Sequence, residues 1–311
     1  MIAVSEDFRI LTSQLIDFDL EAYLEAVERP LPECVRLNTL KFREEKVVEF
    51  MYGRGWRLEK LPWVRHGYRV LEAPISNLGD SIEHMLGLIY LQGPVSMLPA
   101  EVLDVRVGDR CLDLCAAPGS KSTQLAQLVG LEGVVVANDV SQKRVKALSF
   151  NLQRWGAVNS VVTLADGRLF SRWGAGLFDR VLVDVPCSSL GVASKDWSVL
   201  KKYRQNHGKR LQPLQLALLE AGYRCLKAGG VIVYSTCTIM PVENEAVVSR
   251  FLERHPEARL EEVRPEGLKW RRPLEEFGGE RFNSEVEKCF KCYPYDNGGE
   301  GFFIVKIRGG D

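Results

Sequence analysis

Two cysteines stand at the ends of apolar runs that are typical of buried parallel strands. Cys187 closes the sequence Asp-Val-Pro-Cys after Val181–Val183, and Cys237 closes Tyr-Ser-Thr-Cys after Val231–Val233. In an open α/β sheet, ligands bind at the carboxyl ends of parallel strands. Two thiols at that edge, one of them near the carboxylate of Asp184, favour covalent catalysis by a thiolate. The alternative is that both thiols only pack as small apolar side chains.

A second group of residues has the pattern of a cofactor pocket. The segment Cys111–Lys121 is typical of a strand, a tight turn of small residues and the start of a helix. It lacks the G-x-G-x-x-G spacing of a dinucleotide loop, and the one glycine of its turn, Gly119, follows alanines and a proline. Such a turn suits a nucleoside that carries an amino acid better than it suits a pyrophosphate.

Acidic residues follow the next three expected strands. Asp139 ends the strand after this turn, where a carboxylate typically binds ribose hydroxyls. Asp166 follows the third strand and could reach the exocyclic amine of an adenine, and Asp184 ends the fourth strand. Any one of them could be a surface turn residue, but the set predicts a pocket for S-adenosylmethionine.

Methyl transfer to C5 of a pyrimidine would explain the need for a thiol. C5 is not nucleophilic in the aromatic ring, whereas a thiolate that adds to C6 converts the ring into an enamine that can accept a methyl group. The reaction also needs a hydrogen-bonding acid at N3 and a base for the C5 proton. Methyltransferases that act on amines carry an aromatic residue after a D/N-P-P turn. Cys187 stands there instead, which favours C5 chemistry.

The elements that position these residues alternate between strands and helices after about residue 81, which predicts a doubly wound parallel sheet of the α/β class. The expected strands are 110–114, 133–138, 159–164, 179–184, 229–235 and 301–307, and the expected helices are 120–130, 142–153, 212–226 and 242–254. Residues 257–288 are charged and irregular, and we interpret them as an insertion over the sheet edge.

The first part of the chain looks like a small appended α+β unit. Its expected elements are a helix over 8–28, a half-buried strand over 34–40, a helix over 43–53 and strands over 56–60 and 67–72. The stretch from Pro74 to Asp80 is the expected boundary. We therefore predict an N-terminal domain of residues 1–78 and a catalytic domain of residues 79–311.

The basic and acidic side chains of the chain balance each other. The 311 residues include 41 basic and 41 acidic side chains, so the overall charge does not indicate a nucleic-acid partner. Basic residues do cluster locally within 201–210 and 65–69. Taken alone, each cluster is more typical of a solvated surface than of an RNA contact.

The N-terminus, the apolar runs and the cysteines indicate where in the cell the protein is expected. The N-terminus is polar, and no apolar run approaches the roughly 18 residues of a membrane span, so we expect a cytoplasmic protein without a membrane partner. Eight cysteines in a chain of this length are not a secreted disulfide framework. Cys289 and Cys292 form a C-x-x-C without a second pair, so we expect no metal and interpret them as core thiols or an incidental redox-sensitive pair.

Together the motifs resemble the RNA 5-methylcytosine methyltransferase family, the Nol1/Nop2/Sun group, and in particular its archaeal tRNA-directed members. The resemblance spans positions 36 to 303 and is carried by Arg36–Lys41, Gln92, Ser96–Pro99, Asp113–Lys121, Asp184–Cys187, Tyr234–Cys237, Glu243–Glu245 and Gly301–Phe303. It implies a Rossmann-type, S-adenosylmethionine-dependent methyltransferase with a small N-terminal domain that contacts RNA.

The resemblance also implies roles by position. Cys237 would attack C6, and Cys187 would assist elimination and product release. Asp184 would hydrogen-bond the cytosine edge, and Lys121 would lie against the base. The residues that would hold S-adenosylmethionine are Cys115, Ala116, Ala117, Pro118, Gly119, Ser120, Lys121, Asp139, Arg144, Asp166 and Asp184.

Four positions depart from the family pattern. Ser120 and Ser189 stand where glycine is frequent, Lys291 where arginine is common, and Glu300 where aspartate is usual. Because both serines are small, we expect the pocket to be retained. We expect the changes at Lys291 and Glu300 to bear on the target RNA rather than on the chemistry.

The expected substrate is an accessible or flippable cytosine of tRNA, because the chain shows no added RNA-binding module and looks like a compact, monomeric enzyme. Ribosomal RNA and DNA are the alternatives within methyl transfer, and DNA-directed C5 enzymes use the Pro-Cys cysteine as nucleophile. A catalytically idle RNA-binding scaffold is the alternative outside methyl transfer. The presence of both cysteines, Asp184 and Lys121 argues against such a scaffold.

Overall fold

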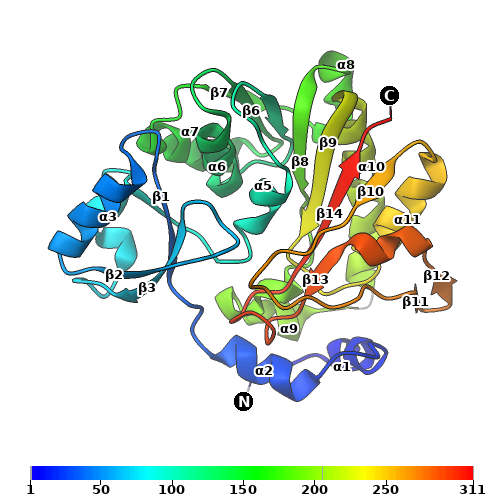
Figure 1. The fold of residues 1–311 in the computed structure, drawn as a ribbon. Helices are drawn as coiled ribbons and strands as arrows, with labels where there is room; N and C mark the ends of the chain where they lie inside the picture. Colours follow the sequence, from blue (N-terminus) through cyan, green and yellow to red (C-terminus); the bar gives the residue numbers. More distant parts are fainter. Residues whose placement is uncertain (1, 205, 311) are drawn as a thin grey trace.

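The computed structural model describes residues 2–204 and 206–310 (Figure 1). An eight-stranded sheet with helices on both faces forms the larger part, and a four-stranded sheet lies beside it. The expected α/β fold, a Rossmann-type sheet with a small N-terminal α+β unit, is confirmed. Within the described residues, none of the helices is both long and apolar enough to cross a membrane.

The large sheet reverses its strand order near its middle. Its order is β10-β14-β9-β8-β5-β6-β7, with β13 paired to β14. Strands β5 to β9 pair in parallel, whereas β14 runs antiparallel to β9. The reversal between β5 and β8 is where open sheets bind ligands beyond the carboxyl ends of their strands. The strands are β5 (Arg110–Asp113), β6 (Val134–Asp139), β7 (Ser160–Leu164), β8 (Phe178–Asp184), β9 (Leu226–Thr236), β10 (Arg259–Glu261), β13 (Phe290–Cys292) and β14 (Phe302–Arg308).

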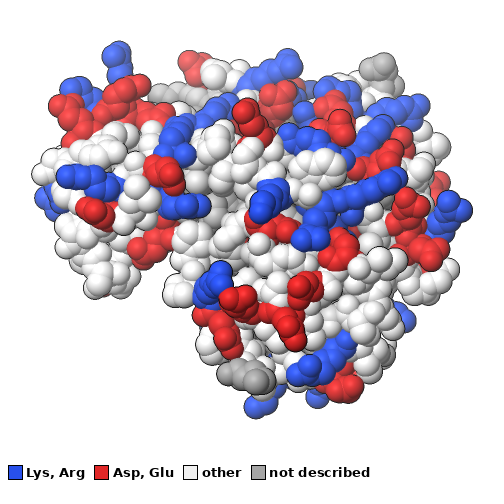
Figure 2. Space-filling model, turned by 60° about the horizontal axis from the view of Figure 1, so that its bottom comes forward, with Lys and Arg blue, Asp and Glu red and all other residues white. Residues whose placement is uncertain are grey.

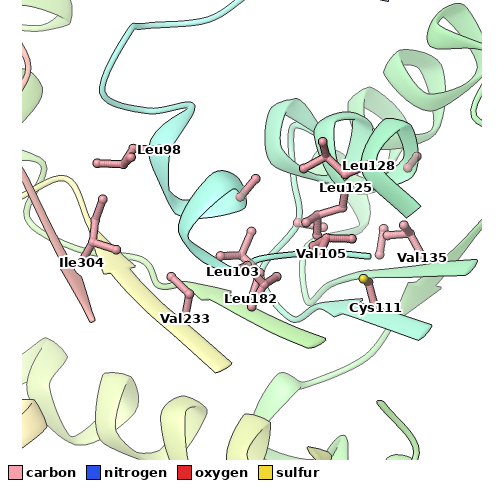
Figure 3. Close-up of a cluster of buried hydrophobic side chains, with 14 of the residues drawn as sticks. Leu98, Leu103, Val105, Cys111, Leu125, Leu128, Val135, Leu182, Val233 and Ile304 are labelled. Atoms are coloured by element: carbon pink, nitrogen blue, oxygen red, sulfur yellow. The ribbon is translucent and has the colours of Figure 1, made fainter. Parts of the chain in front are cut away.

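Helices bury both faces of this sheet, which is why its central strands are apolar on both sides. On one face, Leu125 and Leu128 of α6 pack over apolar side chains of β5, β6, β8 and β9 (Figure 3). On the other face, Leu219 of α10 and Phe251 of α11 belong to a second buried cluster. The helices are α5 (Leu98–Val102), α6 (Ser120–Val129), α7 (Gln142–Trp155), α8 (Ser171–Gly174), α9 (Ser198–Lys202), α10 (Asn206–Arg224) and α11 (Glu245–Arg254).

The small sheet is antiparallel and has the order β2-β3-β1-β4. Its elements are β1 (Cys34–Leu37), α3 (Glu44–Gly53), β2 (Arg57–Lys60), β3 (Gly67–Glu72), α4 (Ile82–Met85) and β4 (Ile89–Leu91). Strand β4 lies beyond residue 78 and pairs with β1. A division into separately folding units at residue 78 stays a prediction.

The prediction of one helix over 8–28 is wrong, because two helices occupy this segment. They are α1 (Glu6–Ser13) and α2 (Leu20–Glu28). Asp19 starts the second helix, since its carboxylate accepts a hydrogen bond from the backbone N–H of Ala22 at 2.9 Å. The apolar spacing continues across the break, which is why periodicity alone did not reveal it.

Both N-terminal helices pack against the loop that follows Cys187. Phe8 of α1 and Tyr23 of α2 share a buried cluster with Leu190. The Tyr23 hydroxyl donates to the carbonyl oxygen of Leu190 at 2.6 Å. Helices α1 and α2 therefore pack against loops of the large-sheet part of the fold, although the next strand, β1, is part of the small sheet.

The strand that was expected over 34–40 spans only Cys34–Leu37 (β1). All four of its residues are buried, whereas a half-buried strand was expected. Arg36 is buried because its side chain points into the interface with α6 rather than into solvent. Its guanidinium donates to Gln127 Oε1 at 2.7 Å, to Thr123 Oγ1 at 2.6 Å and to the Ser120 carbonyl at 3.0 Å. It also lies 4.5 Å from the centroid of the Trp155 ring. The small sheet is thus fastened to the helix that begins at the predicted cofactor loop.

Residues 257–288 do lie at the sheet edge, where β10 pairs with β14. The segment then forms a short hairpin of β11 (Glu276–Phe277) and β12 (Glu280–Arg281). Four short 3-10 helices complete the described fold: η1 (Leu78–Asp80), η2 (Gly167–Leu169), η3 (Leu190–Lys195) and η4 (Ser284–Lys288).

Replacing Arg36 should weaken the fold strongly. We expect Arg36→Met to lower the free energy of unfolding by about 3 kcal/mol, because buried acceptors on α6 would lose a charged donor. Urea unfolding measures this loss. Arg43→Met is the matched control, since Arg43 is exposed, and it should change stability by less than about 0.5 kcal/mol. Equal losses in the two variants would contradict this prediction.

Candidate active site

Parallel pairing of β8 with β9 brings the two cysteines together. Asp184 lies opposite Ser235 in this pairing, and the segments that follow the two strands contain Cys187 and Cys237. The two Sγ atoms are 3.3 Å apart, which is within hydrogen-bonding distance for sulfur. Both residues are partly exposed, so they are accessible from the carboxyl edge of the sheet.

An ion pair lies beside the two thiols. Lys121 Nζ donates to Asp184 Oδ2 at 2.7 Å, and Ser235 Oγ donates to Asp184 Oδ1 at 2.7 Å. The Lys121 side chain is only 9% exposed, and its ammonium lies 5.7 Å from the centroid of the Phe302 ring. A carboxylate has about four acceptor sites, so Asp184 retains capacity for a ligand. The structure thus brings together all four residues that were predicted to be catalytic.

The predicted cofactor loop, residues 115–121, is held by the neighbouring strand and helix. The Ala117 N–H donates to Asp139 Oδ2 at 3.2 Å, and the Ala117 carbonyl accepts a hydrogen bond from the Arg144 guanidinium. Gly119 has a φ of 109°, a left-handed conformation that glycine adopts freely, and it starts α6. The loop is therefore fixed where β5 ends.

The acidic side chains around this loop fit S-adenosylmethionine. Asp113 Oδ2 accepts from Ser122 Oγ at 2.6 Å, while its Oδ1 is buried without a hydrogen-bond partner among the described residues. Burial raises the pKa of Asp113 to about 7. An unpartnered acceptor at the end of β5 suits the donors and positive charge that such a ligand carries. Asp139 and Asp166 follow the next two strands, but Asp166 also forms an ion pair with Arg168 at 2.5 Å.

A buried hydrogen-bond network joins the two cysteine loops. Ser188, next to Cys187, donates through its N–H at 2.9 Å and through its hydroxyl at 2.5 Å to the carboxylate of Glu243. The Ser188 hydroxyl also lies 2.6 Å from that of Thr238, next to Cys237. None of these three residues was predicted from the sequence to belong to the site. The available signal was that each cysteine is followed by a hydroxyl residue, in Cys-Ser and in Cys-Thr.

Backbone contacts bring a third segment to the same place. The Gly191 N–H donates to the Cys237 carbonyl at 2.9 Å, and the Gly301 N–H donates to the Gly191 carbonyl at 2.7 Å. A Cβ atom on Gly191 would lie 2.1 Å from the carbonyl oxygen of Gly301, so only glycine fits there. The close contact of these three segments fixes the backbone of the Thr-Cys turn.

The two thiols are electrostatically different. The hydrogen bond from Cys187 lowers the pKa of Cys237, and the positive charge of Lys121 acts in the same direction. The same hydrogen bond, together with burial, raises the pKa of Cys187 well above its usual range. Burial alone would lower the pKa of Lys121, but the Asp184 carboxylate outweighs burial and raises it. Cys237 is therefore the thiol more easily converted to a thiolate.

Two departures from the family pattern are buried inside the fold. Glu300 accepts hydrogen bonds from the N–H groups of Val95 and Ser96, both at 3.1 Å, and Lys195 Nζ donates to it at 3.0 Å. Lys291 lies 3.2 Å from Glu245 in a buried ion pair. Both side chains are buried, so any influence of these two positions on the choice of target RNA would be indirect, and that influence stays a prediction.

The local basic clusters differ in their surroundings. Arg65, His66 and Arg69 each lie near a carboxylate, at 2.8, 2.7 and 3.5 Å respectively. The basic residues within 201–210 are exposed. On the face drawn in Figure 2, basic and acidic side chains are interspersed, in keeping with the balanced charge. Among the described residues, no group of three or more histidine, cysteine or acidic residues could hold a metal ion.

Comparisons with known proteins agree with this geometry. A family model described as 16S rRNA methyltransferase RsmB/F matches residues 100–308, and one described as the N-terminal domain of 16S rRNA methyltransferase RsmF matches residues 4–94. The chain belongs to the RsmB/F methyltransferase family. The resemblance to the Nol1/Nop2/Sun group is thereby confirmed.

Several members of the family are similar over most of the chain. A tRNA (cytosine(49)-C(5))-methyltransferase of Pyrococcus abyssi is 39% identical over 97% of this chain and 98% of its own length. Ribosomal RNA small subunit methyltransferase F of Shewanella denitrificans is 36% identical over 93% of this chain, which spans only 57% of that relative. The crystal structure of a methyltransferase homolog from Pyrococcus horikoshii has a TM-score of 0.85 and 32% identity, and covers 99% of this chain and 96% of that one.

Because the protein belongs to the RsmB/F family, it is an enzyme. It is a methyltransferase that uses S-adenosylmethionine. The predicted residues that would hold this cofactor surround the carboxyl ends of β5 to β8, at the reversal of strand order. The two cysteines lie at the adjacent strand ends, so methyl donor and thiol share one edge of the sheet.

Alkylation should distinguish the two cysteines. We expect iodoacetamide to modify Cys237 at a lower pH than Cys187, because thiolate is the reactive form and Cys237 has the lowered pKa. At neutral pH Cys237 should be modified several-fold faster than Cys187, because a larger fraction of it is present as thiolate. Mass spectrometry of the two cysteine-containing peptides measures each rate. Faster modification of Cys187 would contradict the assignment.

Proposed function

We propose that the enzyme methylates C5 of a cytosine in RNA through a covalent bond between Cys237 Sγ and C6 of the base. The observation that supports this proposal is the 3.3 Å separation of the two sulfur atoms beside the Lys121–Asp184 ion pair. Transfer to an amine or a hydroxyl needs no thiol, whereas C5 becomes nucleophilic only after addition at C6.

Cys237 begins the reaction as a thiolate. Its electron pair forms the bond to C6, the electrons of the C5–C6 double bond form a C4–C5 double bond, and the electrons of the C4–N3 double bond move onto N3, which takes up a proton from solvent. N3 releases that proton once C5 carries the methyl group. Asp184 accepts hydrogen bonds from the polar edge of the cytosine, and Lys121 holds that carboxylate in place. When bound, S-adenosylmethionine supplies an electrophilic methyl group at this edge. The loop 115–121 with Asp139, Arg144 and Asp166 would hold it.

Cys187 completes the reaction as a base. Its pKa is raised chiefly by the hydrogen bond to Cys237, and this cause disappears once Cys237 is bonded to carbon. Cys187 then loses its proton to solvent more readily and can accept the C5 proton of the methylated ring. The electrons of the C5–H bond re-form the double bond, and the C6–S bond breaks to return Cys237 as a thiolate.

Substitution of each cysteine separates these roles. Cys237→Ala should abolish the covalent adduct with RNA that contains 5-fluorocytosine, because no thiolate reaches C6. Cys187→Ala should accumulate an adduct even with ordinary cytosine, because the C5 proton is not removed. Denaturing gels that resolve protein–RNA adducts measure both outcomes.

Cys225→Ala is the matched control for these variants, because Cys225 is buried at the far end of β9 and should not affect adduct formation. The reverse pattern, with loss of the adduct in Cys187→Ala and accumulation in Cys237→Ala, would contradict the proposal. It would assign the nucleophile as in DNA-directed C5 enzymes.

As the substrate we propose tRNA. The tRNA-directed relative matches this chain over nearly the full length of both proteins, whereas the rRNA-directed relative extends well beyond the matched region. Ribosomal RNA is the second candidate, because both matching family models are described as 16S rRNA methyltransferases. A monomeric enzyme in the cytoplasm, without metal, stays a prediction.

Transfer of a labelled methyl group identifies the substrate class. With labelled S-adenosylmethionine, we expect transfer to bulk tRNA but not to 16S rRNA, and bisulfite sequencing should locate 5-methylcytosine in the labelled RNA. Cys237→Ala is the control and should transfer none. Labelling of 16S rRNA alone would favour the second candidate, and no transfer to any RNA would favour a non-catalytic scaffold.

A further inference from the structure

Ser189 is held in an unfavourable backbone conformation directly after the Pro-Cys motif. Its φ of 58° and ψ of 21° lie in the left-handed region. Among residues 2–204 and 206–310, Asp104 is the only other non-glycine residue with a positive φ. A Cβ atom disfavours this region, so the fold holds Ser189 there at a local cost. Such outliers at functional sites suggest a role for the residue.

The Ser189 hydroxyl lies between the two cysteines. Cys237 Sγ donates to Ser189 Oγ at 3.7 Å, and Ser189 Oγ donates to the Cys187 carbonyl at 3.4 Å. A hydroxyl can rotate its hydrogen toward either neighbour, since it is both donor and acceptor. It can therefore accept from Cys237 when that residue is a thiol and donate to it when it is a thiolate.

We propose that Ser189 stabilises the Cys237 thiolate, its hydroxyl being a second hydrogen-bond donor to this sulfur beside the thiol of Cys187. This inference rests on the proposed covalent mechanism. The Cys187 donor is available for only part of that cycle, because Cys187 changes its protonation state. Ser189 keeps its proton throughout, so its donor serves both when Cys237 attacks C6 and when Cys237 is expelled.

Other charged and titratable groups also face Cys237. They are Asp184 at the end of β8, Cys187 in the loop after β8, and Lys121 from α6. None of them is altered when Ser189 is replaced, so a change in the titration of Cys237 reports on the hydroxyl. The left-handed backbone of Ser189 is a second feature that can affect the titration of Cys237, and two different substitutions distinguish its effect from that of the hydroxyl.

The test compares Ser189→Ala with Ser189→Gly. Both variants remove the hydroxyl, but only glycine also relieves the left-handed backbone. The rate of iodoacetamide modification of Cys237 is followed as a function of pH by mass spectrometry, and thermal unfolding is measured alongside. Ser194→Ala is the matched control, because the buried Ser194 hydroxyl in η3 has no hydrogen-bond partner in the described structure.

We expect both Ser189 variants to raise the pH midpoint of Cys237 modification by about one unit, since a donor to a charged sulfur is lost. Formation of the 5-fluorocytosine adduct below that midpoint should be about ten-fold slower and should recover at higher pH. Ser189→Gly should unfold at the same or a higher temperature than the unsubstituted enzyme. Ser194→Ala should leave the midpoint unchanged.

Two results would overturn the inference. One is an unchanged midpoint in Ser189→Ala. The other is a normal midpoint in Ser189→Gly with a shifted one in Ser189→Ala, which would assign the effect to the backbone. Failure of the proposed mechanism appears separately: the unsubstituted enzyme would form no adduct, or the adduct would persist in Cys237→Ala.

Discussion

The parallel pairing of β8 with β9 is the constraint on which the active site depends. It sets Asp184 opposite Ser235, so the turns that follow the two strands must run side by side. The 3.3 Å contact between Cys187 and Cys237 is a consequence of that register. A shift by one residue would turn the buried side chains to the other face and separate the thiols. The buried helices on both faces of the sheet are what hold this register.

Proximity of the two sulfur atoms produces their chemical difference. One shared hydrogen bond lowers the pKa of Cys237 and raises that of Cys187, so a single contact sets which of the two thiols ionises more readily. The buried hydrogen-bond network of Ser188, Thr238 and Glu243 holds the two cysteine loops against each other at that contact. Geometry and reactivity are therefore fixed by the same few buried groups.

The sequence was sufficient for elements whose signal is local. Apolar runs ending in Cys187 and Cys237 predicted two adjacent strand ends, and the small-residue turn at Gly119 predicted the loop before α6. Contacts between distant segments were not predictable in this way. Arg36 looked like the exposed face of an alternating strand, yet it is buried because α6 packs against β1. The docking of α1 and α2 onto the loop after Cys187 likewise leaves no periodic signature.

The path of the first hundred residues has a mechanical consequence. Helices α1 and α2 pack against the loops at one edge of the large sheet, the chain crosses to the small sheet before β1, and it crosses back after β4. Two covalent crossings, together with the buried Arg36, oppose any hinge-like opening of one unit against the other. The small sheet is therefore attached at a fixed place beside α6. In the proposed mechanism a cytosine must leave the stack of its own helix to reach Cys237, and this attachment leaves that deformation to the RNA.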